Sequence, residues 1–325
     1  MPLSTRLTDR LDIKHPVLLA PMALVAGGAL AGAVTAAGGL GIIGGGYGDA
    51  PWLESQFAAA GNHPVGCGFI TWSLATQPQL LDVALAHKPA AIMLSFGDPR
   101  PFAPRIKAAG ARLICQVQSL AHVEEALAAG ADIIIAQGAE AGGHGSLRGT
   151  LPFVPAVVDF VARRAPETIV AAAGGIADGR GLAAALMLGA EGVLVGTRFY
   201  ASAESLAHPD AKARMVAASG EETIRTSTVD IVRDIPWPRE FTARVMRNGF
   251  VEQWHGAEAA LASAREGEMR RYRDAVTRAD FSIACVFGGE ATAMIDKVEP
   301  AAEIIARMVA DAEAALARGA RLMVP

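Results

Sequence analysis

The sequence predicts an α/β fold, a (β/α)8 TIM barrel with a mostly helical C-terminal cap. Three observations lead to this prediction. Short apolar runs of strand length recur about every 20–25 residues, and an alanine-rich helical segment follows each one. This rhythm stops after Tyr200, where charged helical segments replace it. Hydrophobic residues make up 52% of the chain and charged residues only 19%, which suits a folded protein with a large buried core.

The apolar runs are continuous rather than alternating, as expected for parallel strands that are buried on both faces. An open doubly wound sheet usually has five or six such strands, so eight runs favour the closed barrel. The expected strands are Val17–Ala20, Leu40–Ile43, Val65–Phe69, Ala91–Leu94, Arg112–Gln116, Ile133–Ala136, Thr168–Ala172 and Gly192–Val195.

Helices are expected between these strands, and several end at a glycine that can adopt the left-handed C′ conformation. These glycines are Gly38, Gly61, Gly110, Gly130 and Gly189. The expected helices are Ala29–Ala37, Pro51–Ala60, Gln79–His87, Phe102–Ala109, Ala121–Ala129, Phe153–Arg164 and Gly179–Leu188. A last helix, Ala301–Arg318, is expected to return and pack on the barrel wall.

We expect two structural units, a cofactor-binding barrel formed by residues 1–200 and 290–325 and a helical cap formed by residues 201–289. Within the cap, Ala257–Ala279 interleaves arginine with glutamate and aspartate. Such interleaving is typical of a solvated helix with ion pairs between successive turns, rather than of a surface that binds nucleic acid.

Charge and cysteine content exclude several classes of partner. The 29 basic and 33 acidic residues give a net charge of −4, which argues against nucleic acid or an anionic membrane as the main partner. The uncharged stretch Val17–Gly48 is interrupted by glycines and Pro21, so we interpret it as buried strand, helix and strand rather than a membrane span. No leader sequence and no metal-ligand spacing are evident, and three scattered cysteines indicate reduced thiols in the cytoplasm.

The loops after the seventh and eighth strands carry glycines where a backbone can approach a ligand closely. Gly174 and Gly175 follow one strand, and Gly196 and Thr197 follow the next. Exposed N–H groups there, with the Thr197 hydroxyl, would form a phosphate cradle at the barrel end that commonly holds phosphate. Tight turns that need a positive φ are the alternative explanation for these glycines.

The loop after the sixth strand contains the candidate catalytic residue, His144, in the run Gly142-Gly143-His144-Gly145. A neutral imidazole can accept a proton near neutral pH, and the glycines let it approach a ligand. The alternative is a surface histidine without a role. Glu140 is a possible second acid–base group, although loop glutamates are mostly solvated.

Other residues at the expected mouth suit a flat heteroaromatic ring. Gln116, Gln118 and Gln137 offer uncharged amides that both donate and accept hydrogen bonds. The polarizable sulfur of Met22 could lie against such a ring, with core filling as the alternative. A ring site beside a phosphate site predicts a nucleotide-like cofactor.

Four segments make the chain resemble the nitronate monooxygenase family, formerly called 2-nitropropane dioxygenases. They are Ala20-Pro-Met-Ala23, Gln137-Gly-Ala-Glu-Ala-Gly-Gly-His-Gly145, Ala173-Gly-Gly-Ile-Ala-Asp-Gly-Arg-Gly181 and Gly192-Val-Leu-Val-Gly-Thr-Arg-Phe199. The resemblance covers nearly the whole chain and implies an FMN-dependent barrel enzyme.

The resemblance also implies roles for individual residues. The FMN phosphate would be held by Gly174, Gly175, Gly196 and Thr197, and the ring would lie near Pro21, Met22, Ala23, Gln116 and Gln137, with Gly142 and Gly143 also at the cofactor. His144 would act as a base on a neutral nitroalkane or position an anionic nitronate. Electrons would pass from the nitronate to the flavin, O2 would complete the oxidation, and a carbonyl compound and nitrite would leave. Whether the protein forms a homo-oligomer is left open.

The chain departs from the family pattern at two places. Gly66-Cys67-Gly68-Phe69 stands where many relatives have Gly-Val-Asn, and Gln116 stands where some carry lysine. Gly288-Gly289-Glu290 resembles a family segment at the flavin edge, with Glu290 as an uncertain match. Two alternatives therefore stay open, an NAD(P)H-dependent FMN reductase acting on a quinone or an enoyl thioester, and a flavin- or phosphate-binding protein without turnover.

Overall fold

The barrel predicted from the sequence is present in the computed structural model, which describes residues 3–322. Eight parallel strands are ordered β1-β9-β8-β6-β5-β4-β3-β2. Backbone hydrogen bonds of Leu40 with Val17 and Leu19 join the segment before β2 to β1, so the sheet closes on itself. The strands are β1 (Val17–Leu19), β2 (Ile42–Gly46), β3 (Gly66–Ile70), β4 (Ala91–Ser95), β5 (Arg112–Val117), β6 (Ile133–Gln137), β8 (Ile169–Ala173) and β9 (Val193–Val195).

Alternate residues of the barrel strands belong to two different cores. Val17 and Leu19 face outward and pack with the surrounding helices, whereas Leu18 joins a separate cluster with Met93 and Ile135 inside the barrel. Leu7 of α1 (Arg6–Leu11) packs on the inner cluster. Both faces of each strand are therefore buried, which explains the continuous apolar runs.

Helices cover the outside of the barrel as expected, and the five expected C′ glycines all have positive φ angles. The helices are α2 (Gly28–Ala36), α3 (Ala50–Ala59), α4 (Thr71–Leu74), α5 (Gln79–Ala86), α6 (Ala103–Ala108), α7 (Leu120–Ala128), α8 (Thr150–Arg164), α9 (Gly179–Met187) and α10 (Thr197–Tyr200). The C-terminal helix α15 (Ala301–Ala320) packs against α9 and α2, which confirms its predicted place on the barrel wall.

Most observed boundaries lie within two residues of the predicted ones, and two differ by three residues. β2 continues through Gly44 to Gly46 instead of ending at Ile43, because a Cβ on Gly44 would lie only 2.4 Å from the Met22 carbonyl oxygen. These glycines keep a strand close to the β1 loop and do not end it. Helix α8 begins at Thr150 rather than Phe153, because Glu140, ten residues earlier, accepts hydrogen bonds from the Thr150 N–H.

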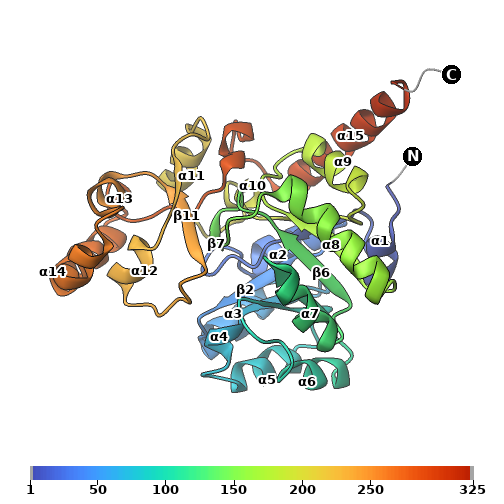
Figure 1. The fold of residues 1–325 in the computed structure, drawn as a ribbon, viewed down its shortest axis with the longest axis horizontal. Coiled ribbons are helices and arrows are strands. Elements are labelled where there is room, and N and C mark those ends of the chain that lie inside the picture. Colours follow the sequence, from blue (N-terminus) through green and yellow to red (C-terminus); the bar gives the residue numbers. More distant parts are fainter. Residues whose placement is uncertain (1–2, 323–325) are drawn as a thin grey trace.

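The cap contains helices, as predicted, and also two strands that the sequence did not predict. Its elements are α11 (Pro209–Val216), β10 (Thr223–Thr226), α12 (Thr228–Arg233), β11 (Thr242–Met246), α13 (Gly249–Trp254) and α14 (Glu258–Thr277), followed by the 3-10 helix η1 (Glu290–Met294). β11 pairs with β10 and with β7 (Gly143–Gly145) to form an antiparallel sheet of three strands. Figure 1 shows β11 running from the cap to β7.

The unexpected strands are polar as well as short. Arg225 and Arg244 face each other across the β10–β11 ladder, and this pattern does not resemble a buried strand. The division of the chain at residues 200 and 290 stays a prediction. Between residues 3 and 322, no helix is both long and apolar enough for a membrane crossing.

Candidate functional site

The strand ends bring most of the predicted site residues to one end of the barrel. Pro21 and Met22 follow β1, Gln116 lies near the end of β5, and Gln137 ends β6. Gly174 and Gly196 directly follow the neighbouring strands β8 and β9. The residues proposed for the phosphate and for the ring thus share the face where barrel enzymes carry their sites.

The two phosphate loops offer backbone donors that the protein itself does not use. The N–H groups of Gly174, Gly175 and Thr197 donate no hydrogen bond to any residue from 3 to 322. Gly174 and Gly175 have φ angles of 103° and 73°, which turn successive N–H groups outward. Unpaired, half-exposed donors on adjacent loops fit an anionic group such as a phosphate.

The Thr197 hydroxyl, which was expected to bind the phosphate, also binds a backbone group of the protein. Its oxygen accepts a hydrogen bond of 3.0 Å from the Gly289 N–H, so it ties the segment before η1 to the loop after β9. The hydroxyl hydrogen is left free to donate to a ligand. Gly289 belongs to the segment that resembles a family segment at the flavin edge, although no role was predicted for this residue.

A pocket of about 300 Å³ adjoins the β8 loop. Gly174, Gly175 and Ile176 line one side, and Ala291 and Met294 of η1 line another. The two acidic lining residues have partners, because Glu140 binds Thr150 and Glu290 pairs with Arg244.

The β1 loop packs closely against its neighbours. The Met22 sulfur lies 3.7 Å from the position that a Cβ of Gly196 would take. A Cβ on Gly68 would lie 2.4 Å from two carbons of Pro21, so the small residue in this departure from the family pattern makes room for Pro21. Ala23 similarly lies against Gly46.

A chain of amides supports the strand that carries His144. The side-chain amide of Gln118 donates to the Gln137 side-chain oxygen over 2.8 Å, and Gln137 donates to the His144 carbonyl over 3.1 Å. Gln118 and Gln137 are buried, whereas Gln116 is half-buried and lines a small cavity. Through this bond to the His144 carbonyl, Gln137 holds β7 in position.

His144 is buried and paired with a carboxylate of the cap. Its Nε2 atom lies 3.0 and 2.9 Å from the two carboxylate oxygens of Asp230 on α12. Its Nδ1 atom makes no hydrogen bond to residues 3–322 and is not among the fully enclosed polar atoms. When Asp230 accepts the Nε2 proton, Nδ1 carries the lone pair that faces the site.

Burial lowers the pKa of His144 below 6.5, and the hydrogen bond and negative charge of Asp230 act in the opposite direction. Nearby Arg233 and Arg225 contribute further to the lowering. The imidazole is therefore neutral near pH 7, the form that can accept a proton.

Aromatic side chains enclose His144. Trp237, in the connection between α12 and β11, stacks on the imidazole with ring centroids 3.4 Å apart and planes 6° apart. Phe96 lies edge-on to both rings and has a φ angle of 64°, which is uncommon for a residue with a side chain. The Trp237 indole N–H donates to the Tyr47 hydroxyl over 2.8 Å.

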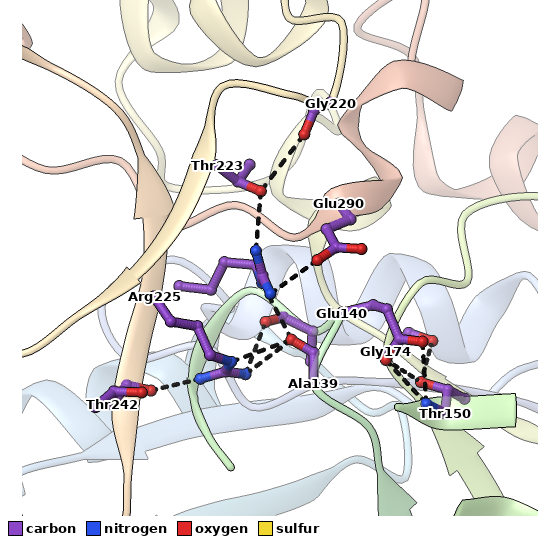
Figure 2. Close-up of polar contacts among 11 residues, drawn as sticks. Ala139, Glu140, Thr150, Gly174, Gly220, Thr223, Arg225, Thr242 and Glu290 are labelled. Atoms are coloured by element: carbon purple, nitrogen blue, oxygen red, sulfur yellow. Dashed lines mark hydrogen bonds and ion pairs between the residues drawn. The ribbon is translucent and has the colours of Figure 1, made fainter. Parts of the chain in front are cut away.

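Side-chain hydrogen bonds fasten the loop between β6 and β7 at two adjacent residues, Ala139 and Glu140. Glu140 accepts hydrogen bonds from the N–H and hydroxyl of Thr150, and the Thr150 hydroxyl also donates to the Gly174 carbonyl (Figure 2). The possibility that Glu140 is a free acid–base group is therefore not supported, because it caps α8. Arg225 donates to the Ala139 carbonyl over 3.2 and 3.1 Å, and Arg244 donates to it over 3.0 Å.

The two glycines before His144 differ in their surroundings. A Cβ on Gly142 would lie 2.6 Å from the Gly289 nitrogen, so this glycine lets two backbones touch. Gly143 has a φ angle of 74° and open space within 4 Å of its Cβ position. Gly142 therefore joins the His144 loop to the segment before η1.

Sequence reasoning missed Asp230, Trp237 and Arg225. Asp230 is 86 positions from its partner His144, and nothing in its local sequence marks it. Trp237 stands between two prolines in a connection without regular structure, which is a weak signal for an ordered aromatic wall. No group of three histidine, cysteine or acidic side chains in residues 3–322 has the arrangement of a metal site.

Comparisons with known proteins point to one family. The family model for nitronate monooxygenase matches residues 4–66 and 69–311. A nitronate monooxygenase of Neurospora crassa is 30% identical, over 92% of this chain and 90% of that protein. The two residues between the matched segments, Cys67 and Gly68, fall in the β3 departure noted above.

Solved structures show the same fold. FabK from Thermotoga maritima has a TM-score of 0.87 at 32% identity, covering 98% of this chain and 99% of that one. A nitroalkane oxidase from Streptomyces ansochromogenes has a TM-score of 0.80 at 25% identity, covering 97% and 99%. Together with the family match over most of the chain, these findings show that the chain belongs to the nitronate monooxygenase family, a family of flavin-dependent oxidoreductases.

Proposed function

We propose that this enzyme uses FMN and O2 to oxidise alkyl nitronates, and the neutral nitroalkanes from which they form, to a carbonyl compound and nitrite. The observation that carries the proposal is the buried pair of His144 and Asp230. One imidazole nitrogen is bound to the carboxylate, and the other is left available at the mouth of a nitronate monooxygenase-type barrel.

The residues at the mouth fit the cofactor that the family implies. The N–H groups of the β8 and β9 loops, at Gly174, Gly175, Gly196 and Thr197, would hold the FMN phosphate. Pro21, Met22, Ala23, Gln116, Gln137, Gly142 and Gly143 would surround the rest of the cofactor. Bound FMN supplies the acceptor for the electrons that leave the nitronate.

His144 supplies the proton chemistry. With a neutral nitroalkane, the Nδ1 lone pair takes the proton from the carbon beside the nitro group, and the anionic nitronate forms. Asp230 stabilises the resulting imidazolium and keeps the ring in one orientation. With a nitronate supplied directly, no proton needs to be removed, and His144 only positions the substrate.

The aromatic enclosure supports this chemistry. Trp237 and Phe96 exclude water from the imidazole, which strengthens the electrostatic effect of Asp230. The phosphate loop after β8 is fastened to the His144 loop, because the Thr150 hydroxyl binds both Glu140 and the Gly174 carbonyl. Cofactor binding and His144 placement therefore depend on one connected loop.

A second candidate function is reduction of a bound flavin by NAD(P)H, followed by transfer to a quinone or an enoyl thioester. The similarity to FabK, with a TM-score of 0.87 at 32% identity, favours it. A cytoplasmic location belongs to the main proposal, supported by free thiols at Cys67, Cys115 and Cys285.

The experiment that separates the candidates follows flavin absorbance under anaerobic conditions. We expect the FMN-loaded protein to lose oxidised-flavin absorbance on mixing with an alkyl nitronate and to regain it in air. Rapid bleaching by NADH or NADPH, with no response to the nitronate, would contradict the proposal and favour the reductase. Failure of the purified protein to retain FMN would exclude both the monooxygenase and the reductase function.

A further inference from the structure

Arg233 stands at the edge of the His144 enclosure without a carboxylate partner. It is the last residue of α12, three positions after Asp230, so the two side chains share one face of the helix. Its guanidinium carbon lies 5.7 Å from the centroid of the Tyr47 ring. Tyr47 in turn binds Trp237, which stacks on His144.

The two nearest carboxylates in the sequence form their ion pairs with other residues, although the negative charge of Asp230 also acts on Arg233. Asp230 receives His144, and the neighbouring Asp234 pairs with Arg265 on the exposed side of the cap. Arg233 makes no ion pair with any carboxylate in residues 3–322, although it is half-buried. Two other enclosed arginines do have carboxylate partners, Arg198 with Glu299 and Arg244 with Glu290.

Burial lowers the pKa of the Arg233 guanidinium, but neighbouring groups that include Cys285, Tyr47 and Asp230 raise it above its ordinary value, so Arg233 keeps its charge. Burial raises the pKa of Tyr47, whereas the positive charge of Arg233 acts in the opposite direction. Arg233 also acts to lower the pKa of His144. Its positive charge therefore acts on both the phenol and the imidazole of the enclosure.

We infer that Arg233 is the residue that recognises the negative charge of the substrate, through the two oxygens of a planar anion. This inference rests on the proposed function and names a specificity-determining residue for it. A guanidinium matches a planar pair of oxygens with two parallel N–H donors, and a nitronate or carboxylate group has that shape.

The walls of the enclosure favour a small planar anion. The Tyr47 ring is the flat surface that adjoins the guanidinium. It lies 6.4 Å from the ring of Trp237, which in turn lies 5.5 Å from that of Trp72. A low local dielectric strengthens the attraction between the guanidinium and an anion held there. An uncharged molecule of the same shape would gain no such attraction.

The test measures anion binding directly and does not depend on turnover. Sodium nitrate, a planar anion with the O–N–O geometry of a nitronate, is titrated by calorimetry into the purified holoprotein, and sodium acetate and inorganic phosphate are titrated in parallel. We expect saturable binding of nitrate and acetate, and weaker binding of tetrahedral phosphate. In Arg233→Met, nitrate affinity should fall about 10- to 100-fold, and Arg233→Lys should retain part of it.

Arg265→Met is the matched control, since it removes an exposed cation from the same cap. This control should bind nitrate like the unmodified protein. In kinetic assays, Arg233→Met should raise the KM for an alkyl nitronate more than it lowers kcat. Failure of the unmodified protein to bind nitrate or acetate, or equal nitrate binding by Arg233→Met, would overturn the inference. Arg233-dependent nitrate binding without any nitronate oxidation would uphold the anion site and reject the proposed function.

Discussion

The chemistry of His144 depends on which of its nitrogens is free. Asp230 binds Nε2, so the imidazole presents Nδ1 to the site in a fixed orientation. Because burial holds the pKa of His144 below 6.5, the ring is neutral through the physiological range. Protonation at acidic pH would remove the lone pair that accepts the substrate proton.

This argument predicts the pH dependence of nitroalkane oxidation. The value of kcat/KM with a neutral nitroalkane should rise with pH to a plateau, and the midpoint of the rise should lie below the ordinary pKa of histidine because burial lowers the pKa of His144. Steady-state oxygen consumption across a pH series measures it. An acidic limb centred above 6.5 would contradict the neutral, buried imidazole.

Replacing Asp230 with asparagine tests the pair. Removing the negative charge removes the main influence that raises the pKa of His144, so the acidic limb should move to still lower pH. The kcat for a neutral nitroalkane should fall about 10- to 100-fold, because a charged hydrogen bond to the imidazolium is lost. Asp234→Asn, which changes an exposed carboxylate on the same segment, should leave both quantities unchanged.

At the residue scale, the sequence identified the groups that stand in a recognisable local pattern. His144 lies in a glycine-rich loop, and Gly174 and Gly196 follow apolar runs. Their position and residue type were therefore enough to predict them as candidate site residues. Asp230 and Arg233 reach the site from α12, and Trp237 from the connection that follows it, and neither segment shows such a pattern. Only tertiary contact with His144 or Tyr47 reveals their importance.

At the element scale, the strand that carries His144 cannot be stable alone. β7 has only three residues, and it exists because β11 pairs with it on one side and Gln137 holds its carbonyl. The preceding loop is fixed by Arg225, Arg244 and Glu140. Burial of Arg225 beside Arg244 lowers the pKa of Arg225 to about 10, so it still carries its charge at neutral pH.

Arg225→Met should therefore destabilise the protein. The substitution leaves the carbonyls of Ala139 and Thr242 with fewer donors, at a cost of about 2 kcal/mol in the free energy of unfolding. Arg270→Met removes an exposed ion pair on α14 and should cost less than about 1 kcal/mol. Urea unfolding of both variants makes the comparison, and equal losses would show that the loop does not depend on Arg225.

The two glycines before His144 provide a matched pair of substitutions. In Gly142→Ala the new methyl group meets backbone atoms of Gly288 and Gly289, so we expect a loss of about 1–3 kcal/mol and weaker retention of flavin. In Gly143→Ala only the positive φ is penalised, at about 1 kcal/mol. Flavin retained after gel filtration and urea unfolding measure both effects. Better flavin retention by Gly142→Ala than by Gly143→Ala would refute the proposed contact.

At the scale of the whole molecule, the barrel was predictable because its strands are buried on both faces. Leu18 and Leu19 face different cores, yet both must be apolar, and this requirement produces a countable series of runs. The strands of the cap were not predictable, because Arg225 and Arg244 occupy them for their contacts with a loop far away in sequence. The Gly44–Gly46 segment was misread for a related reason, since its small residues serve a close tertiary contact.

Cofactor binding should stabilise the whole fold. FMN that binds only the folded state contributes about 2.7 kcal/mol when its free concentration is 100 times the Kd. Adding FMN to the flavin-free protein should therefore raise its Tm. Riboflavin, which lacks the phosphate, should raise it much less, because the N–H groups of Gly174, Gly175 and Thr197 stay unpaired. Equal shifts with both compounds would refute the phosphate cradle.

The most direct test of the central claim compares two substrates in one variant. His144→Asn keeps an amide near Asp230 but cannot accept a proton. With FMN bound, its kcat/KM should fall at least about 100-fold for a neutral nitroalkane and much less for the corresponding nitronate, both measured by oxygen consumption. Unchanged turnover of the neutral nitroalkane, or equal losses with both substrates, would contradict the role of His144 as the base.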